Sequence, residues 1–106
     1  MARLIVFSTC KNKKEAKKIA EELVKRKYAA CVNLLPVTSV FRWKGTVHRG
    51  AEWLLLIKSR SEVFSKLEEC ILSLHSYEMP EIIAFRIHDG LPSYLTWIDR
   101  ETLAIT

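Results

Sequence analysis

The chain has 106 residues, of which 49% are hydrophobic, 27% charged and 9% aromatic, with only three glycines and three prolines. This composition excludes collagen-like, low-complexity and disordered chains, and the length suits one domain, which we expect to span residues 1–106. The net charge of +5 is a local property, because residues 11–27 hold eight basic and three acidic side chains and the remainder balances.

The pattern of apolar residues predicts the first two elements. Residues 3–8 form a continuous apolar run, which is typical of a strand covered on both faces. Asn12 followed by Glu15 has the spacing of a capping box, which predicts a helix N-terminus. Apolar residues then recur at helical spacing from Ala16 to Val24, so we expect a helix that ends near Lys27.

Two long β-rich segments follow, residues 29–43 and 46–59, separated by a Lys44-Gly45 turn. Each arm of about 13 residues reaches roughly 40 Å, whereas a domain of this size has a radius of gyration of about 13 Å. The hairpin tip should therefore overhang the domain. An overhanging ribbon with apolar side chains needs a partner, and the simplest partner is another copy of the chain.

The sequence of the C-terminal half predicts a helix, a strand and a short last helix. Ser61 is a plausible N-cap for a helix with apolar residues from 63 to 74. Residues 81–88 form a fourth strand, and Pro92 suits the first position of a short last helix. The order β-α-β-β-α-β plus a terminal helix predicts an α+β, ferredoxin-like fold with an antiparallel sheet.

At this point five segments resemble one family in their order and spacing. The whole chain from Leu4 to about Ile98 is similar to the CutA divalent-cation-tolerance proteins. The matching segments are Ala29-Ala-Cys-Val-Asn33, Phe41-Arg-Trp-Lys-Gly45, the strand containing Glu52 and Lys58, His75-Ser-Tyr-Glu-Met-Pro-Glu81, and Tyr94-Leu-Thr-Trp97. The resemblance implies a homotrimer assembled through the extended hairpin, with a role in the response to metal ions.

The resemblance also implies candidate metal ligands. Some members of the family resemble copper binders that use a cysteine and two adjacent histidines. The corresponding positions here are Ser8, Leu74 and His75, so His75 alone retains its ligand type. His75 is the candidate metal residue, with copper or zinc as the ion, and no cofactor is expected to be obligatory. The alternative is a structural histidine that closes a helix.

A second candidate site contains Trp43, Lys58, Tyr77, Glu78 and Glu81. Pro80 fixes the chain between the two glutamates, and in a trimer this segment would face Trp43 or Lys58 of a neighbouring subunit. The resulting inter-subunit cleft is either a pocket for a small molecule or metal, or a cluster of interface salt bridges.

Three remaining sequence features bear on reactivity, nucleic-acid binding and location. Cys10 precedes Lys11 at a helix N-terminus, an electropositive setting that lowers the pKa of a thiol. The lysine-rich helix surface is interleaved with glutamates and lacks stacking aromatics, so we expect no nucleic-acid partner. No apolar run could span a membrane and no signal-peptide pattern is present, so we expect a cytoplasmic protein without a membrane partner.

The sequence therefore predicts a CutA-like trimer that tolerates divalent cations and is not an enzyme, since no catalytic signature is recognised. One alternative is a trimeric ligand sensor analogous to PII-type signalling proteins, which would bind a small anion or nucleotide between subunits. Another alternative is hydrolysis by Glu78 and Glu81 as acid and base.

Overall fold

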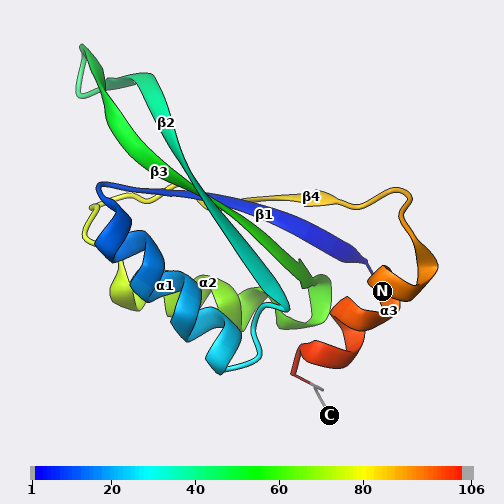
Figure 1. Cartoon of the computed structure of the whole chain (residues 1–106). Coiled ribbons are helices and arrows are strands. Elements are labelled where there is room, and N and C mark those ends of the chain that lie inside the picture. Colours follow the sequence, from blue (N-terminus) through cyan, green and yellow to red (C-terminus); the bar gives the residue numbers. More distant parts are fainter. Residues whose placement is uncertain (1, 104–106) are drawn as a thin grey trace.

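A four-stranded antiparallel sheet with helices packed against it makes up the structure (Figure 1). The computed structural model describes residues 2–103. The elements are β1 (Arg3–Cys10), α1 (Lys13–Lys25), β2 (Cys31–Trp43), β3 (Thr46–Arg60), a 3-10 turn (Ser61–Val63), α2 (Phe64–Leu74), β4 (Ile83–Arg86) and α3 (Pro92–Glu101). The strand order is β2-β3-β1-β4, and the two helices α1 and α2 lie against one another beneath the sheet. The predicted α+β class is confirmed.

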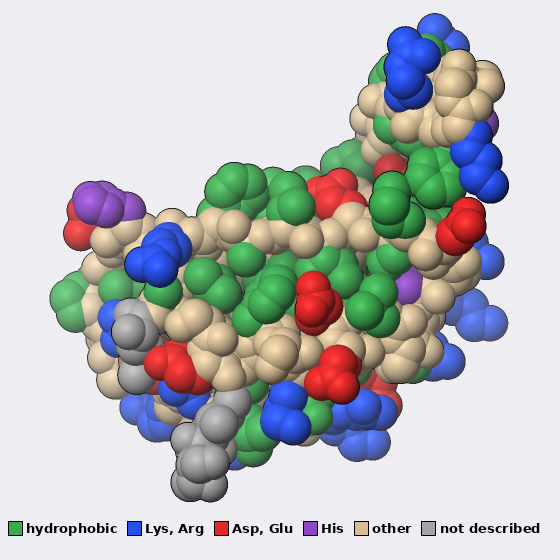
Figure 2. Space-filling view, turned by 180° about the vertical axis from the view of Figure 1, so that it is seen from behind, with side chains coloured by type: hydrophobic (Ala, Val, Ile, Leu, Met, Phe, Trp, Pro, Cys, Tyr) green, Lys and Arg blue, Asp and Glu red, His purple; other side chains and the backbone are tan. Residues whose placement is uncertain are grey.

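The core lies between the sheet and the two long helices. Burial alternates along β1, so Leu4 and Val6 face the helices while Ile5 and Phe7 face the other side. Within the single chain, Ile5 and Phe7 on the second face are only partly buried, so the structure of one subunit does not show coverage of both faces. The continuous apolar run supplies this second face, and seen from behind, hydrophobic side chains gather across the middle of the molecule (Figure 2).

The hairpin of β2 and β3 extends beyond the rest of the sheet. Lys44 and Gly45 close it with positive φ angles of 50° and 79°, the left-handed conformation that a two-residue hairpin loop requires. Pairing of β1 with β3 stops at Cys10 and Trp53, so residues 37–52 project past the last β1 partner. The molecule is 43 × 27 × 21 Å, and the predicted overhang is confirmed (Figure 1).

One element boundary agrees with the sequence prediction and two differ from it. Asn12 caps α1 as expected, because its side chain accepts a hydrogen bond of 2.8 Å from the Glu15 N–H. Ser61 does not cap α2, since its hydroxyl accepts from the Ala2 N–H and a 3-10 turn precedes the helix. The fourth strand is limited to Ile83–Arg86, because only these residues pair with β1.

Two arginines attach the C-terminal helix to the sheet. Arg3 donates from Nε and Nη2 to the Asp99 carboxylate at 3.0 and 2.6 Å, and this hydrogen bond holds the pKa of Asp99 below its usual value. Arg60 is buried, and it donates to the Thr102 hydroxyl and to the Leu103 carbonyl. The helices among the described residues are all too short or too polar to cross a membrane.

One buried serine is expected to weaken the core. Ser8 is fully buried, and its Oγ has no hydrogen-bond partner among the described residues. Ser59 is equally buried, but its hydroxyl donates to the Tyr28 carbonyl at 2.7 Å. Because an unpaired buried hydroxyl is costly and a paired one is favourable, Ser8→Ala should stabilise the fold by about 1 kcal/mol and Ser59→Ala should destabilise it by about 1 kcal/mol. Urea unfolding of both variants checks the signs, and a loss of stability in Ser8→Ala would contradict the assignment.

Candidate functional site

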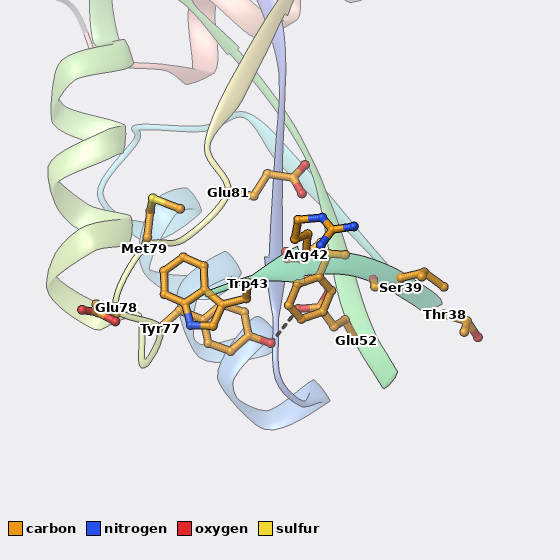
Figure 3. Close-up of a pocket in the computed structure, with 12 residues that line it drawn as sticks. Thr38, Ser39, Arg42, Trp43, Glu52, Tyr77, Glu78, Met79 and Glu81 are labelled. Atoms are coloured by element: carbon orange, nitrogen blue, oxygen red, sulfur yellow. Dashed lines mark hydrogen bonds between the residues drawn. The ribbon is translucent and has the colours of Figure 1, made fainter. Parts of the chain in front are cut away.

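A pocket of about 710 Å³ lies where the hairpin leaves the sheet. Trp43, Tyr77, Glu78 and Glu81, four of the five residues predicted to form the second site, line it (Figure 3). They are far apart in sequence, and the fold of a single chain brings them together. Trp43 comes from the end of β2, and the other three come from the segment between α2 and β4.

Lys58 is the predicted residue that the single chain places elsewhere. It pairs with Ile5 in the sheet, well along β3 from Glu52, the residue of this strand that lines the pocket. Its ammonium group donates to the Asn33 side-chain oxygen and lies 3.9 Å from the Cys31 Sγ. Lys58 therefore belongs to the open face of the sheet and does not line the pocket within this subunit.

Glu52 is a pocket residue that sequence reasoning did not place at the site. The Tyr77 hydroxyl donates to Glu52 Oε2 at 2.6 Å, a link between β3 and the segment after α2 (Figure 3). Burial raises the pKa of the Tyr77 phenol, and the hydrogen bond and charge of Glu52 raise it further. Glu52 immediately precedes Trp53, the first residue of β3 that pairs with β1, and no signal in the sequence marks this position.

The pocket is acidic and its walls are aromatic. Burial raises the pKa of Glu81, and the negative charge of Glu52 adds to this effect. Glu78 is exposed and pairs with Lys44 at 3.7 Å, a surface contact of little energetic weight. Among the described residues of the lining, Arg42 is the only basic one. This charge distribution favours a cationic occupant over a phosphate or another anion.

His75 ends α2 and joins three parts of the chain. Its side chain is 1% exposed. Its ring Nε2 lies 2.7 Å from the Thr9 carbonyl oxygen, and its Nδ1 accepts a hydrogen bond of 3.1 Å from the Tyr77 N–H. The ring also packs on Tyr77 with centroids 4.8 Å apart. The expected position at a helix end is confirmed, and both ring nitrogens have backbone partners.

Cys10 and Glu15 lie beside His75. Cys10 Sγ is 3.8 Å from the His75 Nε2, and Glu15 Oε1 is 3.5 Å from the His75 Nδ1. The expectation that Cys10 occupies an electropositive setting was wrong. Burial raises the pKa of the Cys10 thiol to about 12, and the charges of Glu15 and Glu52 contribute in the same direction. Cys10 is thus a protonated, buried thiol and not an activated nucleophile.

The lysine-rich surface of α1 carries alternating charge. Lysines and glutamates share this exposed face, and the Arg26–Glu22 pair at 3.6 Å belongs to it. The apolar stripe of the helix instead faces the core. This arrangement is typical of a hydrated helix surface.

A family model described as "CutA1 divalent ion tolerance protein" matches residues 4–101. Curated relatives agree with it. The chain is 42% identical to mouse "Protein CutA" over 101 residues and 41% identical to a "Divalent-cation tolerance protein CutA" of Thermus thermophilus over 99 residues. It is also 39% identical to an Arabidopsis thaliana protein described as chloroplastic.

The matches cover this chain almost fully but cover the relatives unequally. They take in 94% of this chain and 57% of the mouse protein, and 93% of this chain and 55% of the Arabidopsis protein. For the Thermus protein the shares are 92% and 96%. The chain therefore spans little more than half the length of the eukaryotic relatives.

Solved structures share the fold. The Thermus thermophilus divalent cation tolerance protein superposes with a TM-score of 0.92 at 40% identity, covering 94% of this chain and 98% of that one. A structure from Archaeoglobus fulgidus, described as a periplasmic divalent cation tolerance protein, has a TM-score of 0.91 at 36% identity, with 93% and 97% covered. Relatives are thus described as periplasmic and as chloroplastic, and the cytoplasmic location stays a prediction.

Proposed function

Because this chain belongs to the CutA1 divalent ion tolerance family, we propose that it works as a homotrimer in tolerance to divalent cations, by binding metal ions and not by catalysis. The observation that carries this proposal is the family match over residues 4–101, together with the agreement in fold. The strand order β2-β3-β1-β4 supports the ferredoxin-like topology on which such a trimer is built.

Features of the subunit support self-assembly. Residues 37–52 project from the sheet, and Val40 and Phe41 on them are 65% and 47% exposed. Ile83 and Phe85 on the edge strand β4 are similarly exposed. Apolar side chains on exposed strands are covered when neighbouring subunits pair their sheets, and a closed ring of subunits leaves no edge free. The trimer is the closed assembly that the family resemblance implies.

The acidic pocket supports a cation and not an anion as the ligand. Glu52, Glu78 and Glu81 would repel a phosphate group, so the alternative of a nucleotide or small anion is not favoured. Hydrolysis by Glu78 and Glu81 also lacks support, because Glu78 is exposed and is paired with Lys44.

Growth under metal stress tests the proposal. We expect that expression of this chain in a host that lacks its own family member will improve growth in elevated copper, relative to an empty vector. The matched control is a monomeric variant expressed to the same level, which should not protect. Equal growth of wild type and empty vector over a copper titration would contradict the proposed function.

A further inference from the structure

Three side chains of metal-binding type meet where β1 ends, α1 begins and α2 ends. They are Cys10, Glu15 and His75, and one ligand atom from each lies within 4.8 Å of the others. Cys10 is fully buried, and the side chains of His75 and Glu15 are 1% and 13% exposed. A thiol, an imidazole and a carboxylate from three separate elements are therefore collected in an interior position, unlike a group of surface acids.

We propose that Cys10, Glu15 and His75 form a binding site for one borderline divalent cation such as Zn²⁺. This inference rests on the proposed function and names a cation site separate from the acidic pocket, to which the contact between His75 and Tyr77 joins it. A thiolate and a carboxylate together supply two negative charges, which a divalent ion neutralises, and imidazole adds a neutral nitrogen. Tetrahedral zinc holds sulfur and nitrogen ligands about 3.6 Å apart. The Cys10 Sγ and the His75 Nε2 are 3.8 Å apart.

The donor set differs from the one that the family resemblance implies. At those positions this chain has Ser8 and Leu74, and Leu74 offers no metal ligand. Side chains two residues apart on a strand point to the same face, about 6.6 Å from each other. Cys10 therefore keeps the helix-facing side that Ser8 has, but lies at the end of β1 where His75 packs. Glu15, in the first turn of α1, completes the set.

Ion binding requires one proton to leave. The Cys10 thiol is protonated at neutral pH, so formation of the metal–sulfur bond transfers its proton to the buffer. Glu15 offers a carboxylate oxygen and His75 an imidazole nitrogen, neither of which needs a further bond to be broken. Each metal–sulfur bond formed therefore breaks one S–H bond and releases that proton.

Binding also changes the hydrogen bonds of His75 in a predictable way. In the metal-free arrangement its Nδ1 accepts from the Tyr77 N–H. If the ion binds Nδ1, this lone pair is used. If the ion binds Nε2, neutral imidazole carries its proton on Nδ1, which then cannot accept. In both cases the Tyr77 N–H loses its acceptor, so ion binding is expected to change the environment of this amide.

Calorimetric titration of Zn²⁺ into the full chain tests the site. Zinc is the probe because it has no redox reaction with the thiol. We expect one ion bound per chain, with one proton released when the titration is repeated in buffers of different ionisation enthalpy. Cys10→Ser and Glu15→Gln should each weaken binding by at least about tenfold. The matched controls are Cys70→Ser, another buried cysteine, and Glu22→Gln, another α1 carboxylate, and both should bind as wild type does.

A second measurement does not depend on any substitution. In an amide NMR spectrum of wild type, Zn²⁺ should shift the Tyr77 N–H signal. An unmoved Tyr77 signal, or unchanged affinity in Cys10→Ser, would overturn this site while leaving the divalent-cation function intact. If wild type binds neither zinc nor copper by calorimetry, the site and the metal-binding part of the proposed function both fail.

Discussion

Phe85→Glu is expected to convert the assembled protein into monomers. Phe85 lies on β4, an edge strand of the sheet, and is 53% exposed in the single chain. Its ring contacts Phe7 on the uncovered face with centroids 5.2 Å apart. A charge placed here would have to be buried without a partner when subunits close over this face, and that cost opposes assembly. Multi-angle light scattering after gel filtration should show a threefold lower mass than for wild type.

Leu72→Glu is the matched control. Leu72 is 54% exposed, like Phe85, but lies on α2 in the helical layer. A charge on that surface stays in water, so the variant should elute with the mass of wild type. A wild-type chain that already sediments as a monomer at micromolar concentration would contradict the trimer, and an unchanged mass for Phe85→Glu would show that β4 lies outside the interface.

His75→Ala is expected to cause the largest loss of stability, about 3 kcal/mol. The substitution removes a side chain that is 1% exposed and leaves the Thr9 carbonyl and the Tyr77 N–H without their partners. Each unpaired buried backbone group costs roughly 1–3 kcal/mol, and the lost packing on Tyr77 adds to this. Urea unfolding of the metal-free protein measures the difference in the free energy of unfolding.

His88→Ala is the control for this substitution. His88 has a side chain that is 98% exposed, and its contact with Asp89 at 3.5 Å lies in solvent. Its removal should change stability by less than about 0.5 kcal/mol. If His75→Ala unfolds at the same urea concentration as His88→Ala, the ring does not have the structural role that its hydrogen bonds indicate.

Much of the fold could be predicted because its signals are local. The helical spacing of apolar residues, the Asn12 cap and the Lys44-Gly45 turn each specify a conformation within a few residues. The length of β4 could not be predicted in this way, because a strand exists only where another strand pairs with it. Ile87 donates to the Arg3 carbonyl, yet the ladder itself is confined to Ile83–Arg86.

The candidate site was predicted only in part, because distant segments of the chain come together to form it. Trp43, Tyr77, Glu78 and Glu81 were predicted to meet between neighbouring subunits, and they do share a pocket, but within one chain. The importance of Glu15 and Cys10 depends on the packing of the α1 N-terminus and the β1 end against the end of α2. Neither sequence spacing nor the family's ligand positions reveals that contact.

The pairing pattern of the sheet also bears on how the chain folds. A two-residue loop joins the arms of the β2–β3 hairpin, so their pairing closes only a very short loop and can form within microseconds. Pairing of β1 with β3 must instead bring together segments separated by α1 and β2, which costs loop-closure entropy. We therefore expect the ribbon to form early in the folding of each subunit and to present its tip to sister chains before the N-terminal strand has joined the sheet.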